Sequence, residues 1–119
     1  MRAISISCGL YLIAHAALAG AAKSPLEDTW WNADVSCYIT DVILQPEGRA
    51  MIFYQDGRND GGRWTFSGST LTITFETYDD SFTGRYNGAT IRATHTWSED
   101  RRTRRSEDCV LTEINGPAT

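Results

Sequence analysis

The sequence is poor in zinc ligands and lacks the signatures of common enzymes. Its 119 residues include two histidines and three cysteines, whereas a zinc site needs several such ligands at close spacing. No nucleophile-elbow motif places a serine beside His95. The adjacent carboxylates Asp79 and Asp80 fall in a turn region, where such groups are normally solvated rather than catalytic. We therefore expect no metal ion, no cofactor and no catalytic residue, in a protein that is not an enzyme.

A long apolar run is present only near the N-terminus. Arg2 precedes it, and Ala17 and Ala19 follow in the small-x-small arrangement that signal peptidase accepts. The run falls short of the ~20 strongly apolar residues that a membrane span requires. We expect residues 1–22 to be a cleaved signal peptide and residues 23–119 to form a single β-barrel domain without membrane contact. The protein would then be secreted or periplasmic, and the absence of Asn-x-Ser/Thr sites favours the periplasm.

The net charge and the cysteines indicate what the protein does not bind and how its fold is stabilised. The formal net charge of −4 argues against binding to nucleic acid or to an anionic membrane. Cys37 and Cys109 are the two cysteines left after signal cleavage, which predicts a disulfide in an exported chain. A reactive or metal-binding thiolate is the alternative. Closing a loop of about 70 residues restricts the unfolded chain by about 4 kcal/mol, a large share of a small domain's stability.

No helical periodicity follows the signal segment, and apolar residues instead alternate with polar ones. Leu71, Ile73 and Phe75 alternate with threonines, as a half-buried strand requires. Turn signals, among them Asn87-Gly88 and the glycine-rich segment 56–62, separate such runs. The expected strands are 28–32, 36–45, 49–55, 62–67, 69–77, 81–87, 89–98 and 104–114. About eight strands joined by hairpins predict an all-β, antiparallel, up-and-down barrel, whose interior is either filled or holds one small ligand.

A histidine on a predicted strand and a run of arginines in a predicted turn are relevant to binding. His95 alternates with Ile91, Ala93 and Trp97, so we expect a hydrogen-bonded histidine on the inner face of the barrel. The basic run Arg101, Arg102, Arg104 and Arg105 lies at the tip of the last hairpin. It is either neutralised by the flanking Glu99, Asp100, Glu107 and Asp108 or contacts a protein partner.

Three stretches resemble the avidin and streptavidin family of barrels, or related lipocalin-like barrels. Thr29–Ser36 (TWWNADVS) is similar to the first strand and turn of avidins, Phe82–Trp97 (FTGRYNGATIRATHTW) to the sixth and seventh strands, and 107–113 (EDCVLTE) to the last strand. The resemblance implies ligand-binding roles for Asn32, Ser36, Tyr54, Trp97 and Asp108. The first three would hydrogen-bond a ureido-type head group, Trp97 would stack on the ligand, and Asp108 would orient a ring nitrogen. If Ser36 and Asp108 point inward, Cys37 and Cys109 point outward.

These observations predict a secreted, non-catalytic binding module for a small, biotin-like ligand. The alternative is a protein-interaction domain, such as an inhibitor or an immunity-type protein, with a filled barrel. An open, aromatic-lined interior would favour the first, and a packed interior with ordered loops would favour the second.

Overall fold

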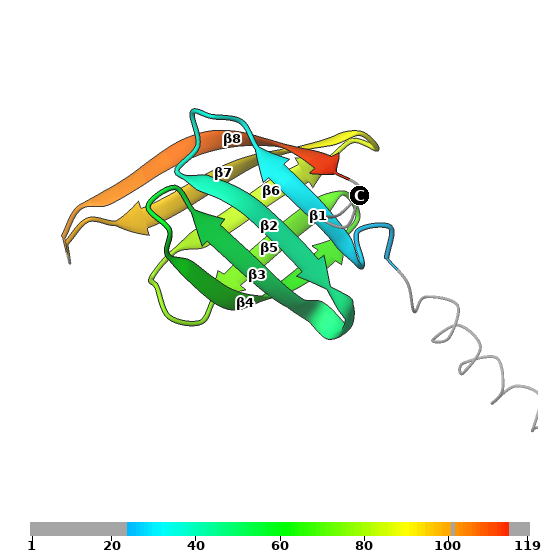
Figure 1. Ribbon diagram of the computed structural model, residues 1–119, viewed down its shortest axis with the longest axis horizontal. Coiled ribbons are helices and arrows are strands. Elements are labelled where there is room, and N and C mark those ends of the chain that lie inside the picture. Colours follow the sequence, from blue (N-terminus) through cyan, green and yellow to red (C-terminus); the bar gives the residue numbers. More distant parts are fainter. Residues whose placement is uncertain (1–23, 101, 115–119) are drawn as a thin grey trace, which may run out of the picture.

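The protein is a closed barrel of eight antiparallel strands, seen in a computed structural model that describes residues 24–100 and 102–114 (Figure 1). Each strand pairs with the next along the chain, and β8 pairs with β1 to close the barrel. The expected signal peptide lies outside the described residues, as does Arg101. The strands are β1 Thr29–Ala33, β2 Ile39–Gln45, β3 Arg49–Tyr54, β4 Asn59–Ser67, β5 Thr70–Phe75, β6 Ser81–Tyr86, β7 Thr90–Ser98 and β8 Arg104–Ile114. The predicted all-β, up-and-down barrel is confirmed.

One predicted turn is shorter than expected. Residues 56–62 read as a glycine-rich turn, but β4 begins at Asn59 and includes Gly61 and Gly62. A Cβ atom on Gly62 would lie 2.6 Å from the backbone oxygen of Thr74 on β5. The glycine therefore permits close approach of neighbouring strands, and only Gly57, with φ of +91°, serves the turn itself.

Side chains fill the interior of the barrel. The period-two alternation of the strands brings their apolar residues inward, as the sequence pattern predicts. One end is closed by Leu26, which precedes β1, and by Trp31, whose ring meets Tyr86 edge to face at 6.1 Å. The buried apolar residues of the strands are Trp31, Ala33, Ile39, Val42, Leu44, Ala50, Ile52, Tyr54, Trp64, Leu71, Ile73, Phe75, Phe82, Ile91, Ala93, Cys109 and Leu111.

The predicted Cys37–Cys109 disulfide is present, with 5.3 Å between the Cα atoms. Both cysteines are 1% exposed and lie on the inner face, so the expected outward orientation is wrong. On β8, Cys109 and Leu111 are buried, whereas Asp108, the residue before Cys109, is exposed. The bridge therefore fastens the segment before β2 to the inside of β8.

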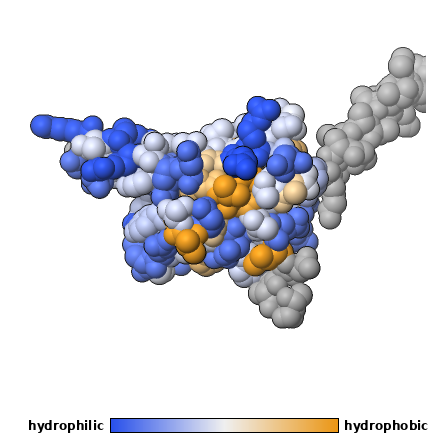
Figure 2. All heavy atoms as spheres, turned by 90° about the horizontal axis from the view of Figure 1, so that it is seen from above, coloured by the Kyte–Doolittle hydropathy of each residue, from blue (hydrophilic) through white to orange (hydrophobic). Residues whose placement is uncertain are grey.

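Four of the loops that join the strands lie at the same end of the barrel. Loops 34–38, 55–58, 76–80 and 99–103 gather at one end, which we call the mouth and which lies on the left in Figure 1. The β7–β8 hairpin extends beyond the mouth, and Figure 2 shows it as a largely hydrophilic projection. Within residues 24–100 and 102–114, no helix has the length and hydropathy needed to cross a bilayer.

Candidate functional site

A buried polar cluster lies beneath the mouth. His95 on β7 is fully buried, with Nε2 2.7 Å from Oδ2 of Asp80 and Nδ1 2.9 Å from Oε2 of Glu107. The expectation of a hydrogen-bonded histidine on the inner face is thus confirmed. The expectation that Asp80 is solvated is wrong, because its side chain is 9% exposed. The loop before β6 brings the carboxylate of Asp80 to the buried imidazole.

Further donors fix both carboxylates. The hydroxyl of Tyr54 on β3 donates to Asp80 at 3.1 Å, and the backbone N–H of Tyr38 donates to Glu107 at 2.9 Å. Burial and the nearby Asp80 carboxylate raise the pKa of Tyr54, so its hydroxyl stays protonated and remains a donor. Each carboxylate is therefore held by the imidazole and by a second group, and this sets the position of the cluster.

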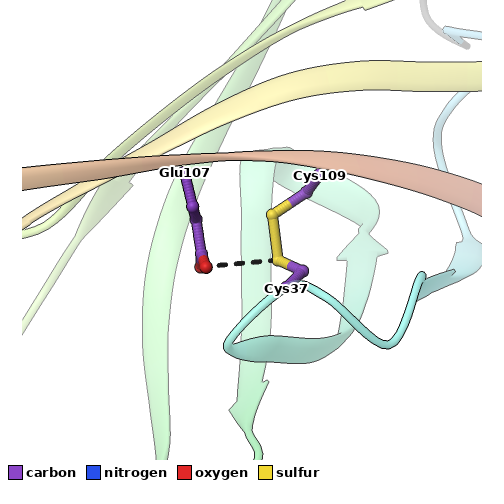
Figure 3. A group of neighbouring side chains, drawn as sticks. All are labelled: Cys37, Glu107 and Cys109. Carbon is purple, nitrogen blue, oxygen red and sulfur yellow. Dashed lines mark hydrogen bonds between the residues drawn. A yellow bond between two sulfur atoms is a disulfide. The ribbon is translucent and has the colours of Figure 1, made fainter.

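The disulfide lies directly beside this cluster (Figure 3). Sγ of Cys37 is 3.6 Å from Oε2 of Glu107, and Cys109 is two residues along β8. Cys37, Glu107 and Cys109 are close enough together to ligate a metal ion. Metal binding by cysteine requires a thiolate, however, and the disulfide removes both thiolates. The bridge instead keeps loop 34–38 against Glu107.

A second buried carboxylate organises loop 76–80. Asp60 on β4 is 3% exposed and accepts hydrogen bonds from the backbone N–H groups of Gly61, Thr77 and Tyr78, at 2.9 to 3.1 Å. These bonds satisfy donors that would otherwise be buried without partners. Asp60 therefore fixes the loop that carries Tyr78 and Asp80 to the mouth.

Aromatic side chains form the rim above the polar cluster. The ring of Tyr54 meets Tyr38 at 5.6 Å and Tyr78 at 5.7 Å, both edge to face. Trp97 stacks on His95 with 5.0 Å between the ring centroids, and the ring centroid of Phe75 lies 6.2 Å from that of the imidazole. The ring of His95 is thus packed against two aromatic rings and is fully buried.

Arg58, in the β3–β4 loop, lies over the tyrosines. Its Nε is 2.7 Å from Oδ2 of Asp56, and its Nη2 donates to the hydroxyl of Tyr38 at 2.9 Å. That hydrogen bond to Tyr38, with the pairing to Asp56, raises the pKa of Arg58. The hydroxyl of Tyr38 in turn donates to Asp56 and lowers the pKa of that carboxyl. Arg58 is therefore a permanent cation whose charge is balanced by Asp56.

These groups surround two neighbouring hollows at the mouth. The larger has a volume of about 570 Å³ and is lined by Val35, Ser36, Tyr38, Gln55, Arg58, Trp97, Glu99 and Glu107. The smaller has a volume of about 140 Å³ and is lined by Tyr38, Tyr54, Arg58, Tyr78, Asp79, Asp80, Trp97 and Ser98. Since both are lined by Tyr38, Arg58 and Trp97, they form one continuous candidate site.

The residues implied by the avidin resemblance separate into two groups. Ser36, Tyr54 and Trp97 lie at the mouth. Asn32 and Asp108 lie on the outside of the barrel, where Asn32 donates to the backbone oxygen of Thr40 and Asp108 accepts from Thr94. Their expected inward orientation is wrong, because the strand positions beside them, such as Trp31 and Cys109, take the inner face.

The basic run of the last hairpin is partly neutralised. Arg104 pairs with Asp79 at 3.2 Å and Arg105 with Glu99 at 3.1 Å. Arg102 is exposed, and Arg101 lies outside the described residues. Glu107 does not balance these arginines as expected, because it faces inward toward His95.

The sequence contained a signal for Glu107 that the interpretation missed. His95 and Glu107 occupy directly paired positions on β7 and β8. Placing the centre of this hairpin at residue 101 is enough to pair them, since paired positions are equidistant from the turn. Asp60 and Arg58 carry no comparable signal.

Comparisons with protein-family models, curated proteins and solved structures find no match for this chain.

Proposed function

We propose that the protein is a non-catalytic module that binds a small ligand at the mouth of the barrel. The observation that carries the proposal is the hollow of about 570 Å³ lined by Trp97, Tyr38 and polar side chains. Small-molecule sites typically measure ~300–1,000 Å³ and combine aromatic walls with a few placed polar groups.

The rigidity of the floor supports a binding role. Below Trp97, the imidazole of His95 is fixed by Asp80 and Glu107, and the disulfide holds the neighbouring loop. A site that is already ordered loses less conformational entropy when a ligand binds. Binding at this end would therefore need little rearrangement of the floor.

The surroundings of His95 support the absence of catalysis. Both ring nitrogens face carboxylate oxygens, and the ring packs against Trp97 and Phe75 and is fully buried. A general base must reach the proton that it removes, directly or through one water. The enclosed imidazole is arranged to support the site rather than to contact a ligand.

The avidin resemblance suggests biotin, but the residues that it implies are divided between the mouth and the outer surface. The filled interior also leaves the mouth as the better location for a ligand. Biotin is thus one member of the panel to be tested. The proposed setting is outside the cytoplasm, secreted or periplasmic, as the N-terminal segment suggests.

The test is a ¹⁵N-NMR titration of the oxidised protein with biotin and a panel of small polar metabolites. A bound ligand should shift the indole N–H resonance of Trp97. The indole of Trp64 is an internal control, because it donates to the backbone oxygen of Gln45 at the opposite end. The variant Trp97→Leu should weaken binding, whereas Trp30→Leu, on the outer surface beside Asp41, should not. Saturating shifts confined to Trp64, or no shifts at all, would refute the proposal.

The filled interior favours a second candidate, a protein-interaction domain. Val35 at the mouth is 93% exposed, and the projecting β7–β8 hairpin carries the exposed Arg102. An inhibitor or immunity-type protein would present such a loop and hairpin to its partner. This candidate gains support if no small ligand shifts Trp97 and a partner binds the native protein but not the variants Val35→Asp and Arg102→Glu.

A further inference from the structure

We propose that the mouth selects small organic cations, those that carry a quaternary ammonium or guanidinium group, and that Arg58 occupies the cation position in the free protein. The inference rests on the proposed function and specifies its ligand. It is carried by the three tyrosine rings that surround the Arg58 guanidinium and by the excess of carboxylates around them.

The tyrosines form an aromatic cage around the arginine. Cζ of Arg58 is 5.8 Å from the ring centroid of Tyr38, 5.0 Å from that of Tyr54 and 4.7 Å from that of Tyr78. Cations within ~6 Å of a ring centroid are attracted by the negative face of the ring. Trp97 lines the same hollow and supplies a fourth aromatic wall. Cages of this kind are suited to quaternary ammonium and other diffuse cations.

The cage is fixed by buried hydrogen bonds, whereas its occupant Arg58 is held by exposed groups. Tyr54 is buried and bonded to Asp80, the backbone N–H of Tyr78 donates to Asp60, and the backbone of Tyr38 is held by Glu107. The side chain of Arg58 is 44% exposed, and that of its partner Asp56 is 41% exposed. An exposed ion pair of this kind contributes little to stability. The guanidinium can therefore leave the cage while Asp56 or solvent continues to balance its charge.

The charges around the cage favour a cation over an anion. The carboxylates at the mouth are Asp56, Asp79, Asp80, Glu99 and Glu107. They outnumber the basic groups in contact with them, Arg58, His95, Arg104 and Arg105, even with His95 counted as a cation. Arg58, Arg104 and Arg105 are each already paired. An anionic ligand would meet repulsion and find its cations engaged, while a cationic ligand would be attracted.

Competition with Arg58 gives the proposal a distinctive consequence. A ligand that enters the cage must displace the guanidinium, so its apparent affinity is reduced by the fraction of molecules in which the cage is occupied. The variant Arg58→Gln removes this competitor and one positive charge. Its affinity for an organic cation should rise roughly fivefold or more. An anion-binding site would respond in the opposite direction, because it would lose the Arg58 cation above the rings.

The experiment is a calorimetric and ¹⁵N-NMR titration of the oxidised full chain with choline and with guanidinium. The neutral comparison is 3,3-dimethyl-1-butanol, which has the shape of choline without its charge, and the anionic comparison is acetate. Choline should bind at least about fivefold more tightly than the alcohol and should shift the indole N–H of Trp97. Tyr78→Leu should weaken this binding, while Tyr78→Phe, which keeps an aromatic face, should retain it. Unchanged amide spectra away from the mouth verify that each variant is folded.

The outcomes separate the two proposals. If a neutral or anionic member of the panel shifts Trp97 but choline and guanidinium do not, the cation inference is wrong and the mouth remains a ligand site. If cations bind and Arg58→Gln weakens them, the role of Arg58 as a resident competitor is overturned. If no ligand of any charge shifts the indole N–H resonance of Trp97, both the proposed small-ligand function and the cation inference are refuted. Tighter binding of choline by Arg58→Gln supports both.

Discussion

Replacing Cys37 and Cys109 together with alanine should greatly lower the free energy of unfolding. The bridge joins residues 72 positions apart, and closing a loop of that length restricts the unfolded chain by about 4.4 kcal/mol at 25 °C. Both cysteines are 1% exposed, so the shorter alanine side chains add a small cavity penalty. For a domain of this size, a loss of about 4 kcal/mol corresponds to a fall in Tm on the order of 20 °C.

The effect should also be uneven across the barrel. Cys37 precedes Tyr38, whose backbone N–H donates to Glu107 on β8. Without the bridge, loop 34–38 loses its covalent attachment to that strand. Amide hydrogen exchange at Tyr38 should therefore accelerate more than exchange at Ile73 in β5, which is far from the bridge in the sheet order.

The assay is urea unfolding followed by circular dichroism. The double variant should show a lower midpoint and a larger m value, because its unfolded chain is more expanded. Adding a reductant to the native protein should reproduce this curve, and adding it to the double variant should change nothing. A loss below about 1 kcal/mol, with reduction verified by mass, would refute the view that loop closure dominates the contribution of the bridge.

Three further predictions concern buried and hydrogen-bonded carboxylates, each to be measured by urea unfolding. Asp60→Ala should lower the free energy of unfolding by about 3 kcal/mol, because backbone N–H groups in loop 76–80 lose a buried acceptor. Asp60→Asn, which keeps one acceptor oxygen, should lower it by less. Equal losses for the two variants would contradict this account. His95→Leu should cost about 3–5 kcal/mol, because Asp80 and Glu107 then face each other without the imidazole, and a neutral result would show that both remain solvated. Hydrogen bonds from Ser36 and the backbone N–H of Val110 lower the pKa of Asp34 below its ordinary value of 3.8. The charged carboxylate of Asp34 therefore stabilises the fold above pH 3.8, and this stabilisation is lost as the pH falls through the lowered pKa. Asp34→Asn should thus be less stable than the native protein at pH 7 but similar in strong acid, and a difference that is independent of pH would exclude the linkage.

Strands such as β5 and β7 could be predicted because their apolar residues repeat a simple period. In β5 and β7, apolar residues occur at every second position, and the structure places Leu71, Ile73, Ile91 and Ala93 inside. The period was ambiguous in β1, where Trp30 and Trp31 are adjacent and either could take the inner face. The structure buries Trp31. Choosing the other tryptophan would turn Asn32 inward, which is the orientation that the avidin resemblance required.

The site could be predicted only where its residues belong to regular strands. His95, Trp97 and Tyr54 follow the alternation, so their position on the inner face was accessible from the sequence. Tyr38, Arg58 and the pair Tyr78 and Asp80 lie in three different loops, and their approach depends on closure of the barrel and on the path of each loop. No periodicity relates such positions. The cage is therefore a property of the closed barrel that local patterns do not contain.

The interior of the barrel is filled by apolar side chains at one end and by a polar cluster at the other. At the closed end, Leu26 and Trp31 fill the interior with apolar volume. At the mouth, comparable space is occupied by His95 and two carboxylates, although well-packed apolar side chains are often as stabilising as a buried ionic group or more so. The polar cluster offers a different advantage, because hydrogen bonds to Asp80 and Glu107 fix the hydroxyl of Tyr54 and the backbone of Tyr38. A leucine cluster would fill the same volume without these hydrogen bonds, and the aromatic cage depends on the positions that they fix.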